Sequence, residues 1–416
     1  MNLKRSPLAP AAFPKLPDVK GLKAATASRG FYASRGLTRD DVFLMVFDEG
    51  TAAAGVYTRS VTASADVLWC REALSRGQGD GRALVVNSGN SNAFTGAKGT
   101  LKNEATLGAM TEALGVPKTS CFLAATGVIG EPLSDPNYVG AIVPALAETL
   151  DTPDWEALAQ AFMTTDTFPK GAGETLNLGG YDVSVSGIAK GSGMIQPNMA
   201  TMLAYVVTDA AVDAAILQAM LADIVEPTFN SITVDSDTST SDTLMVFATG
   251  ASGAPKITRA DDPHYEMLRE ALETVCRDLS HQIVKDGEGA SKFVTVEITG
   301  AENYASARKI AFAIANSPLV KTALAAGDAN WGRVVMAMGK SLEPIDVNKL
   351  AIWFGDLQVA SEGGRAEGYD EERASEICGA DEITIRADAG VGSGEARVFT
   401  CDLTHGYVEI NGAYRT

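Results

Sequence analysis

The chain has 416 residues, of which 46% are hydrophobic, so it is long enough for two domains with separate hydrophobic cores. Its formal net charge of −18 at pH 7 argues against nucleic acid or an anionic membrane surface as a partner. No apolar run approaches the roughly 20 residues of a membrane-spanning helix. Together with five scattered cysteines that form no Cys-x-x-Cys pair, these properties favour a cytoplasmic protein with reduced thiols.

Short strands and helices are expected throughout the first half of the chain. Segments 41–47 and 52–58 are apolar runs on either side of Asp-Glu-Gly-Thr, which predicts a β-hairpin. Segment 181–188 alternates between apolar and polar residues and predicts a strand that leads into a glycine-rich loop. The other elements expected before residue 200 are helices at 65–75, 101–114, 136–150 and 155–163, and strands at 83–87 and 121–125.

The second half continues this mixture and, after about residue 350, consists mainly of short strands. The expected helices lie at 210–225, 265–284, 308–313 and 319–325. The expected strands lie at 201–207, 244–248, 292–299, 351–360, 382–389, 396–403 and 406–416. Because strands and helices are mixed without regular βαβ spacing, we predict a mixed α/β (α+β) fold. A glycine-rich stretch near 286–290 marks the expected boundary between a larger domain at 1–290 and a smaller α/β domain at 291–416.

Metal-binding and phosphate-binding motifs are absent from the sequence. The three histidines, His264, His281 and His405, lack the spacing of zinc ligands. The aspartates of segment 235–243 begin like a calcium loop, but the twelfth position holds Val246 where such a loop needs Glu. A turn rich in Ser, Thr and Asp is the better interpretation of that segment. We therefore expect no metal and no organic cofactor.

One threonine stands where an unusual nucleophile could form. The stretch AKGSGMIQPNMATMLAYVVTDA, residues 189–210, carries a glycine-rich loop, then Ala200, and then Thr201 at the start of an apolar run. If the Ala200–Thr201 bond is cut, the new α-amine of Thr201 can act as general base for its own hydroxyl. An α-amine has an unperturbed pKa of about 7.7–8.0, which suits a general base near neutral pH. Taken alone, the same residue also fits a structural threonine at a strand edge.

The string KGSGMIQPNMATML closely resembles the signature of the ornithine/glutamate N-acetyltransferase (ArgJ) family of arginine biosynthesis. Five further motifs match that family: ATGVIG at 125–130, MTTDTFPK at 163–170, DGEGAS at 286–291, GDANWGR at 327–333 and NGAYRT at 411–416. The family usually has Thr at the place of Ser291, and many members have His or a small residue at the place of Gln196. The resemblance implies a layered sheet-and-helix, N-terminal-nucleophile-like (ArgJ-type) core in domain 1–290. It also implies self-cleavage between Ala200 and Thr201 into an α chain, 1–200, and a β chain, 201–416.

The resemblance also implies the roles of individual residues. Thr201 is the expected nucleophile, and Thr126 and Gly127 match the family's oxyanion hole. The residues that match its substrate contacts are Thr164, Lys190, Thr201, Glu288, Asn411 and Thr416. From the residues alone, the same positions are a turn after a strand, a capping turn, a solvated lysine and a frayed chain end.

The activity implied by the resemblance is a two-step acetyl transfer. Thr201 takes the acetyl group of N-acetylornithine, ornithine leaves, and glutamate then becomes N-acetylglutamate. The widespread bifunctional form implies acetyl-CoA as a second donor to glutamate, and the expected assembly is a heterotetramer of two α and two β chains. Two other hypotheses stay open at this stage: an N-terminal-nucleophile amidohydrolase or aminopeptidase, with water as acceptor, and a small-molecule-binding protein that neither cleaves itself nor becomes acetylated.

Overall fold

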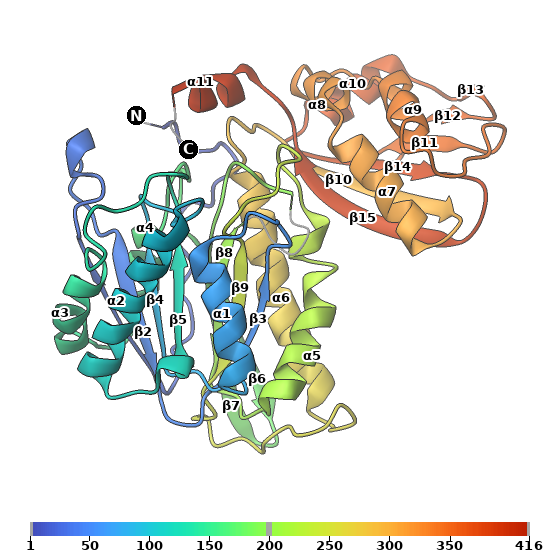
Figure 1. Ribbon diagram of the computed structural model, residues 1–416. Helices are drawn as coiled ribbons and strands as arrows, with labels where there is room; N and C mark the ends of the chain where they lie inside the picture. Colours follow the sequence, from blue (N-terminus) through green and yellow to red (C-terminus); the bar gives the residue numbers. More distant parts are fainter. Residues whose placement is uncertain (1–2, 197–201, 414–416) are drawn as a thin grey trace.

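The computed structural model describes residues 3–196 and 202–413 and places them in a large layered body and a smaller lobe (Figure 1). The body contains two β-sheets that face one another, and helices cover the outer face of each sheet. The mixed α/β fold with layered sheets is therefore confirmed. None of the helices in the described part of the chain combines the length and apolarity needed to cross a membrane.

The first sheet has four strands in the order β1 (Leu22–Ala27), β2 (Val42–Phe47), β4 (Ala83–Asn87) and β5 (Cys121–Ala125). Its central strands are buried on both faces because their alternate side chains enter two different cores. In β2, for example, Phe43 and Met45 face the second sheet, whereas Leu44 faces the outer helices. β4 and β5 are parallel, so their carboxyl ends meet at one edge of the sheet.

The second sheet has five strands in the order β3 (Ala52–Tyr57), β9 (Thr243–Ala248), β8 (Leu203–Thr208), β7 (Tyr181–Lys190) and β6 (Lys170–Leu178). Aromatic side chains join it to the first sheet: Phe47 stacks on Phe247 with ring centroids 4.2 Å apart. Each buried Phe contributes about 1.5–3 kcal/mol to stability, so this shared core holds the two sheets together.

Helices complete the four layers of the body. The first sheet is covered by α2 (Gly96–Leu114) and α3 (Val143–Glu148), and the second by α5 (Ala214–Val225) and α6 (Tyr265–Lys285). α6 buries Leu268, Leu272 and Leu279, whose spacing of three to four residues places them on one face. α1 (Ala65–Arg76) and α4 (Trp155–Ala161) add side chains to the core between the sheets.

The lobe is built on a six-stranded sheet with its own hydrophobic core. The strand order is β13 (Gly364–Arg365), β12 (Leu357–Ser361), β11 (Ala351–Phe354), β14 (Glu382–Asp388), β10 (Phe293–Ala301) and β15 (Gly394–Cys401). Its helices are α7 (Tyr304–Ala315), α8 (Pro318–Ala325), α9 (Trp331–Gly339) and α10 (Glu371–Gly379). The chain then returns to the body as α11 (His405–Ala413), as Figure 1 shows. The division at residues 290/291 stays a prediction.

Two predicted elements are wrong. The expected hairpin at 41–58 does not form, because β2 pairs in the first sheet with β1 and β4 while β3 pairs in the second with β9. The turn between them carries the chain from one sheet to the other. The expected strand at 406–416 is the helix α11 as far as the described residues reach. There Gly406 packs against Gly289, and Tyr407 and Asn411 find partners in the body, so tertiary contacts outweigh local β-propensity.

The remaining differences are elements that the sequence patterns did not indicate. β1, β6, β13, α9 and α10 are found where no element was expected, and the strand expected at 351–360 is divided into β11 and β12. The predicted helix at 136–150 is shorter, with a 3-10 turn at Gly140–Ile142 followed by α3.

Candidate active site

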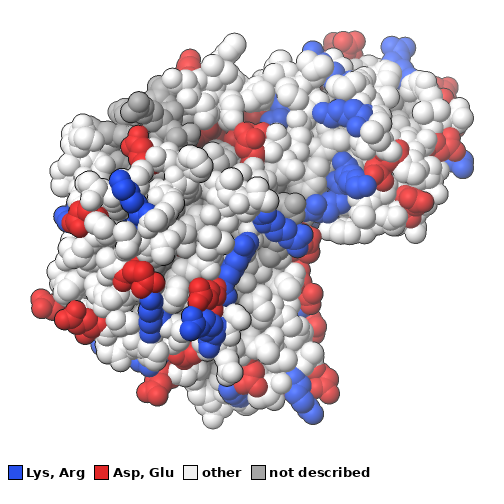
Figure 2. Space-filling view, viewed as in Figure 1, with Lys and Arg blue, Asp and Glu red and all other residues white. Residues whose placement is uncertain are grey.

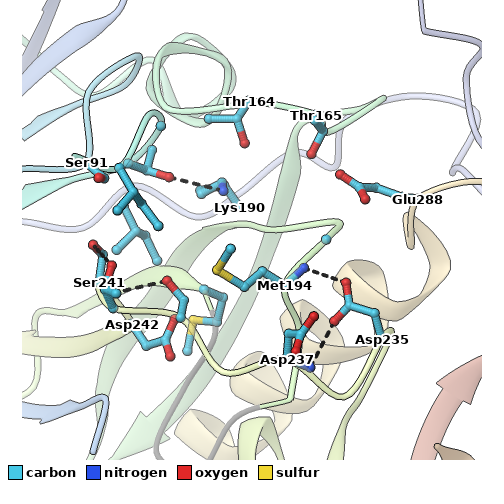
Figure 3. A pocket seen from close by; sticks show the side chains of 18 of the residues that line it. Ser91, Thr164, Thr165, Lys190, Met194, Asp235, Asp237, Ser241, Asp242 and Glu288 are labelled. Atoms are coloured by element: carbon cyan, nitrogen blue, oxygen red, sulfur yellow. Dashed lines mark hydrogen bonds between the residues drawn. The ribbon is translucent and has the colours of Figure 1, made fainter. Parts of the chain in front are cut away.

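A cavity of about 270 Å³ lies where loops of both sheets meet α11. Figure 3 shows its polar lining from close by. Figure 3 shows Thr164 and Lys190 on one side of it, Asp235 and Asp237 on the other, and Met194 between them. Its lining comes from segments far apart in the sequence: Ser91, Thr126, Gly127, Ile129, Thr164, Thr165, Lys190, Gly193, Met194, Met202, Leu203, Asp235, Asp237, Ser239, Thr240, Ser241, Asp242, Glu288, Tyr407 and Asn411.

Six of the residues predicted from the sequence line this one cavity: Thr126, Gly127, Thr164, Lys190, Glu288 and Asn411. Ala200, Thr201 and Thr416 lie outside the described residues. Met202, the covalent neighbour of Thr201, also lines the cavity. The structure thus brings the predicted residues together, while their individual roles stay predictions.

The loop after β5 approaches the loop after β4 so closely that only glycine fits at one position. The Thr126 N–H donates to the Asn87 carbonyl at 3.0 Å, which fixes the first residue after the strand. Gly127 has φ of +129°, and a Cβ on it would lie 2.5 Å from the carbonyl carbon of Gly89. Both its conformation and its close approach therefore require glycine.

Replacing Gly127 with Ala should consequently destabilise the protein rather than alter the cavity alone. The unfavourable backbone conformation costs about 1–3 kcal/mol, and the collision with Gly89 adds to it. Urea unfolding should show a lower midpoint than for Gly108→Ala, a helical glycine whose Cβ would meet no neighbour within 4 Å. Equal midpoints for the two variants would contradict this reading of the loop.

Lys190, the last residue of β7, extends from the second sheet toward the loop of the first. Its Nζ donates to Thr126 Oγ1 at 3.3 Å. Burial lowers the pKa of the Lys190 ammonium, while the charges of Asp166 and Glu288 act in the opposite direction. A buried cation with one hydroxyl partner at a cavity wall can hold the carboxylate of a small molecule.

A buried carboxylate behind the cavity joins two of its walls. Asp166 accepts hydrogen bonds from the Thr164 N–H at 2.9 Å and from the Gly191 N–H at 2.6 Å. It also pairs with the fully buried Lys170, which contacts Asp286 in turn. Burial alone would raise the pKa of Asp166, but the positive charges of Lys170 and Lys190 hold it below its usual range. Asp166 therefore fixes the backbone beside both Thr164 and Lys190.

Glu288 faces the cavity from the loop after α6 and is held by the glycine-rich loop and by α11. Its backbone N–H donates to the Ser192 carbonyl at 2.9 Å, and Asn411 Nδ2 donates to its Oε2 at 2.6 Å. A Cβ at Gly193 would collide with the Glu288 carboxylate, so glycine allows this close approach. Burial raises the pKa of Glu288, and the nearby charge of Asp235 adds to the effect, while the Asn411 hydrogen bond opposes it.

Sequence reasoning missed the acidic wall opposite Lys190 and treated its residues as a turn. Asp235 accepts from the N–H groups of Met194 and Ile195 at 2.7 and 2.8 Å, and Tyr407 donates to it at 3.3 Å. Asp242 is buried, which raises its pKa well above the usual value. The missed signal is the pairing of two strands. β8 and β9 are parallel with Leu203 opposite Thr243, so the loop before β9 lies beside the start of β8.

Among the described residues, no three His, Cys, Asp or Glu side chains are grouped as metal ligands.

Comparisons with known proteins show the family to which the chain belongs. The model of the ArgJ family matches residues 23–416. The arginine biosynthesis bifunctional protein ArgJ of Brucella suis biovar 1 is 53% identical, with all of both chains covered, and that of Rhizobium meliloti is 53% identical over 99% of each chain. Among solved structures, the arginine biosynthesis bifunctional protein ArgJ of Bacillus halodurans is 39% identical and covers 50% of this chain and 98% of its own, with a TM-score of 0.49.

Proposed function

Because the chain belongs to the ArgJ family, we propose that the cavity is the active site of an acetyltransferase of arginine biosynthesis. It transfers the acetyl group of N-acetylornithine to glutamate and also takes acetyl groups from acetyl-CoA. The observation that carries the proposal is the convergence of Thr126, Lys190 and Glu288, three residues from distant segments, on one cavity next to the start of β8.

The proposed nucleophile is Thr201, which is bonded directly to the cavity-lining residue Met202. Cleavage of the Ala200–Thr201 bond frees the α-amine of Thr201, which takes the proton of the Thr201 hydroxyl as its oxygen attacks the acetyl carbonyl. The C–N bond of N-acetylornithine then breaks, and the amine returns the proton to the leaving nitrogen. In the second half the amine of glutamate attacks the acetyl carbonyl of acetyl-Thr201, and the ester C–O bond breaks. The proton lost by the attacking amine passes through Glu288 and the Thr201 amine to the Thr201 oxygen and restores the free hydroxyl. These steps need no cofactor.

Thr126 and Gly127 are the proposed oxyanion hole. The Lys190 ammonium donates to Thr126 Oγ1, so the hydroxyl hydrogen of Thr126 remains free to point at a developing negative charge. Gly127 presents its backbone to the cavity without a side chain in the way. Donors fixed in this manner stabilise the tetrahedral intermediate of acyl transfer.

Replacing Thr126 with Val should lower kcat for acetyl transfer by roughly 10²–10³-fold, because the oxyanion loses a hydroxyl donor while the side chain keeps its shape. Thr126→Ser keeps the donor and should stay close to the unmodified enzyme. Steady-state rates for N-acetylornithine and glutamate provide the comparison, with circular dichroism as a check on folding. A normal kcat in the Val variant would exclude the oxyanion role.

The remaining residues are proposed to select amino-acid substrates. Lys190 binds the substrate carboxylate, and Thr164 and Asn411 contact the substrate beside it. Glu288 accepts a proton from the attacking amine, since a carboxylate with a raised pKa is a better base near neutral pH. Thr416 joins them as a further contact. We also propose a cytoplasmic enzyme assembled from two α chains and two β chains.

The test is a denaturing intact-mass spectrum recorded before and after incubation with N-acetylornithine. We expect two species that divide the chain between Ala200 and Thr201, with one acetyl group added to the fragment that begins with Thr201. Added glutamate should remove that acetyl group and yield N-acetylglutamate. An uncut, unmodified chain would contradict the proposal, and so would ornithine release that glutamate does not accelerate, since that marks a hydrolase.

A further inference from the structure

A second cavity, of about 620 Å³, lies between the body and the lobe. It is an open groove with α7 on one side and the end of α5 with the following 3-10 turn, Phe229–Ser231, on the other. Figure 2 shows Lys and Arg side chains on both sides of the junction between lobe and body. The residues that matter for its chemistry are Arg59, Gln196, Glu226, Tyr304, Arg308 and Lys309.

The groove is cationic in a chain that is strongly anionic overall. Arg59, Arg308 and Lys309 line it, and Glu226 is the single acidic residue among the described residues of its lining. Glu226 accepts a hydrogen bond from the Asn230 side chain at 2.7 Å. Lys309 pairs with Glu343 at 2.7 Å. The local excess of positive charge therefore comes mainly from the two arginines, and it attracts anions that the rest of the surface repels.

The side chain of Arg308 is held in a fixed orientation at the wall of the groove. Its guanidinium lies 4.7 Å from the ring centroid of Phe312, and one of its Nη atoms donates to the Asn230 carbonyl. Its Nε is buried and has no hydrogen-bond partner in the part of the chain that the structure describes. An oriented guanidinium that lines an open groove is suited to a phosphate group. Tyr304, half of which is exposed, adds an aromatic surface nearby.

Gln196 connects the lining of the groove to the lining of the catalytic cavity. The Gln196 side chain lines the groove and accepts from Asn316 Nδ2 at 2.7 Å. The Gln196 N–H donates to the carbonyl of Asp237, and Asp237 lines the catalytic cavity. The two cavities thus meet at one loop.

From these observations, and resting on the proposed function, we propose that the groove binds the phosphate-bearing nucleotide end of an acyl-CoA donor. The catalytic cavity of about 270 Å³ suits an amino acid but not a nucleotide thioester. The arginines bind the phosphates, Tyr304 offers its ring to the base, and the flexible arm carries the acetyl group past Gln196. The C–S bond of the thioester breaks as the bond to Thr201 Oγ forms, and the hydroxyl proton passes through the Thr201 amine to the sulfur.

Donor-specific kinetics test this assignment. Arg59→Ala and Arg308→Ala should each raise KM for acetyl-CoA roughly ten- to a hundredfold, since each removes a charge-assisted hydrogen bond. Transfer from N-acetylornithine should stay unchanged in both variants, because that donor lies wholly in the catalytic cavity. Lys349→Ala, an exposed lysine of the lobe outside the groove lining, is the matched control and should change neither donor.

A second probe separates binding from folding effects. Adenosine 3′,5′-bisphosphate should inhibit the acetyl-CoA reaction competitively, leave transfer from N-acetylornithine intact, and lose potency in Arg59→Ala. Equal effects of the arginine variants on both donors, or no effect on either, would overturn the groove assignment alone. A wild-type enzyme that takes no acetyl group from acetyl-CoA would overturn the groove assignment together with the acetyl-CoA part of the proposed function. Loss of N-acetylornithine transfer in the wild type would instead overturn the proposed function.

Discussion

Thr201→Ala is expected to yield a single uncut chain that transfers no acetyl group. Without the hydroxyl there is no nucleophile for the cleavage or for the acetyl group, and removal of a catalytic nucleophile lowers kcat by up to about 10⁶-fold. Intact-mass spectrometry measures the cleavage, and release of ornithine in the presence of glutamate measures the transfer.

Thr201→Ser is the matched control for this variant. Serine keeps a hydroxyl and, after cleavage, an α-amine, so this variant should be cut and acetylated, though at a different rate. If Thr201→Ala were cut and active like the wild type, the nucleophile would have to be another residue, and the proposed mechanism would be lost. If it folded to the same thermal midpoint but stayed uncut and inactive, the assignment would stand.

Lys170→Met is expected to cost about 3–5 kcal/mol of unfolding free energy, because it leaves two buried carboxylates without a cation. The Lys170 side chain is fully buried, and its Nζ lies 2.7 Å from Asp166 and 2.6 Å from Asp286. Asp166 precedes the proposed cleavage point and Asp286 follows it, so this ionic group also joins the two fragments.

Urea unfolding in the Thr201→Ala background should be used to measure the effect, since an uncut chain unfolds without a dissociation step. Lys256→Met is the matched control: Lys256 pairs with Asp213 at 2.5 Å, but both side chains are largely exposed. That variant should change the unfolding free energy by about 0–1 kcal/mol. A similarly small change for Lys170→Met would show that the buried group contributes little to stability.

The motifs proposed to be catalytic were recognisable in the sequence because each is a short run of consecutive residues at the end of a strand or helix. Thr126 follows β5 directly, and Lys190 ends β7, so local pattern and position in the cavity coincide. Their meeting at one cavity could not be derived from the runs themselves, because it depends on how two sheets face one another. The family resemblance supplied that information.

The acidic wall was missed because its residues carry a second, local explanation. Asp235 and Asp237 are typical turn formers, and only the parallel pairing of β8 and β9 brings their loop beside Met202 and the start of β8. The hairpin predicted at 41–58 is wrong because a local pattern was followed where pairing with a distant strand decides the structure. Two apolar runs with a short polar turn satisfy every local rule for pairing, yet β3 finds its partner, β9, almost 200 residues later.

The strand order of the second sheet determines what a cut at residue 200 can do. β8 and β9 belong to the later fragment, and they lie between β3 and β7 of the earlier one, hydrogen-bonded on both sides. Neither fragment can therefore complete this sheet by itself, and the chain has to fold before it is cut. Once cut, recovery after unfolding becomes a second-order encounter between two incomplete pieces. The lifetime of the cut enzyme is then governed by its rate of unfolding. Dilution slows the refolding of the two fragments, whereas it does not affect the refolding of the uncut chain.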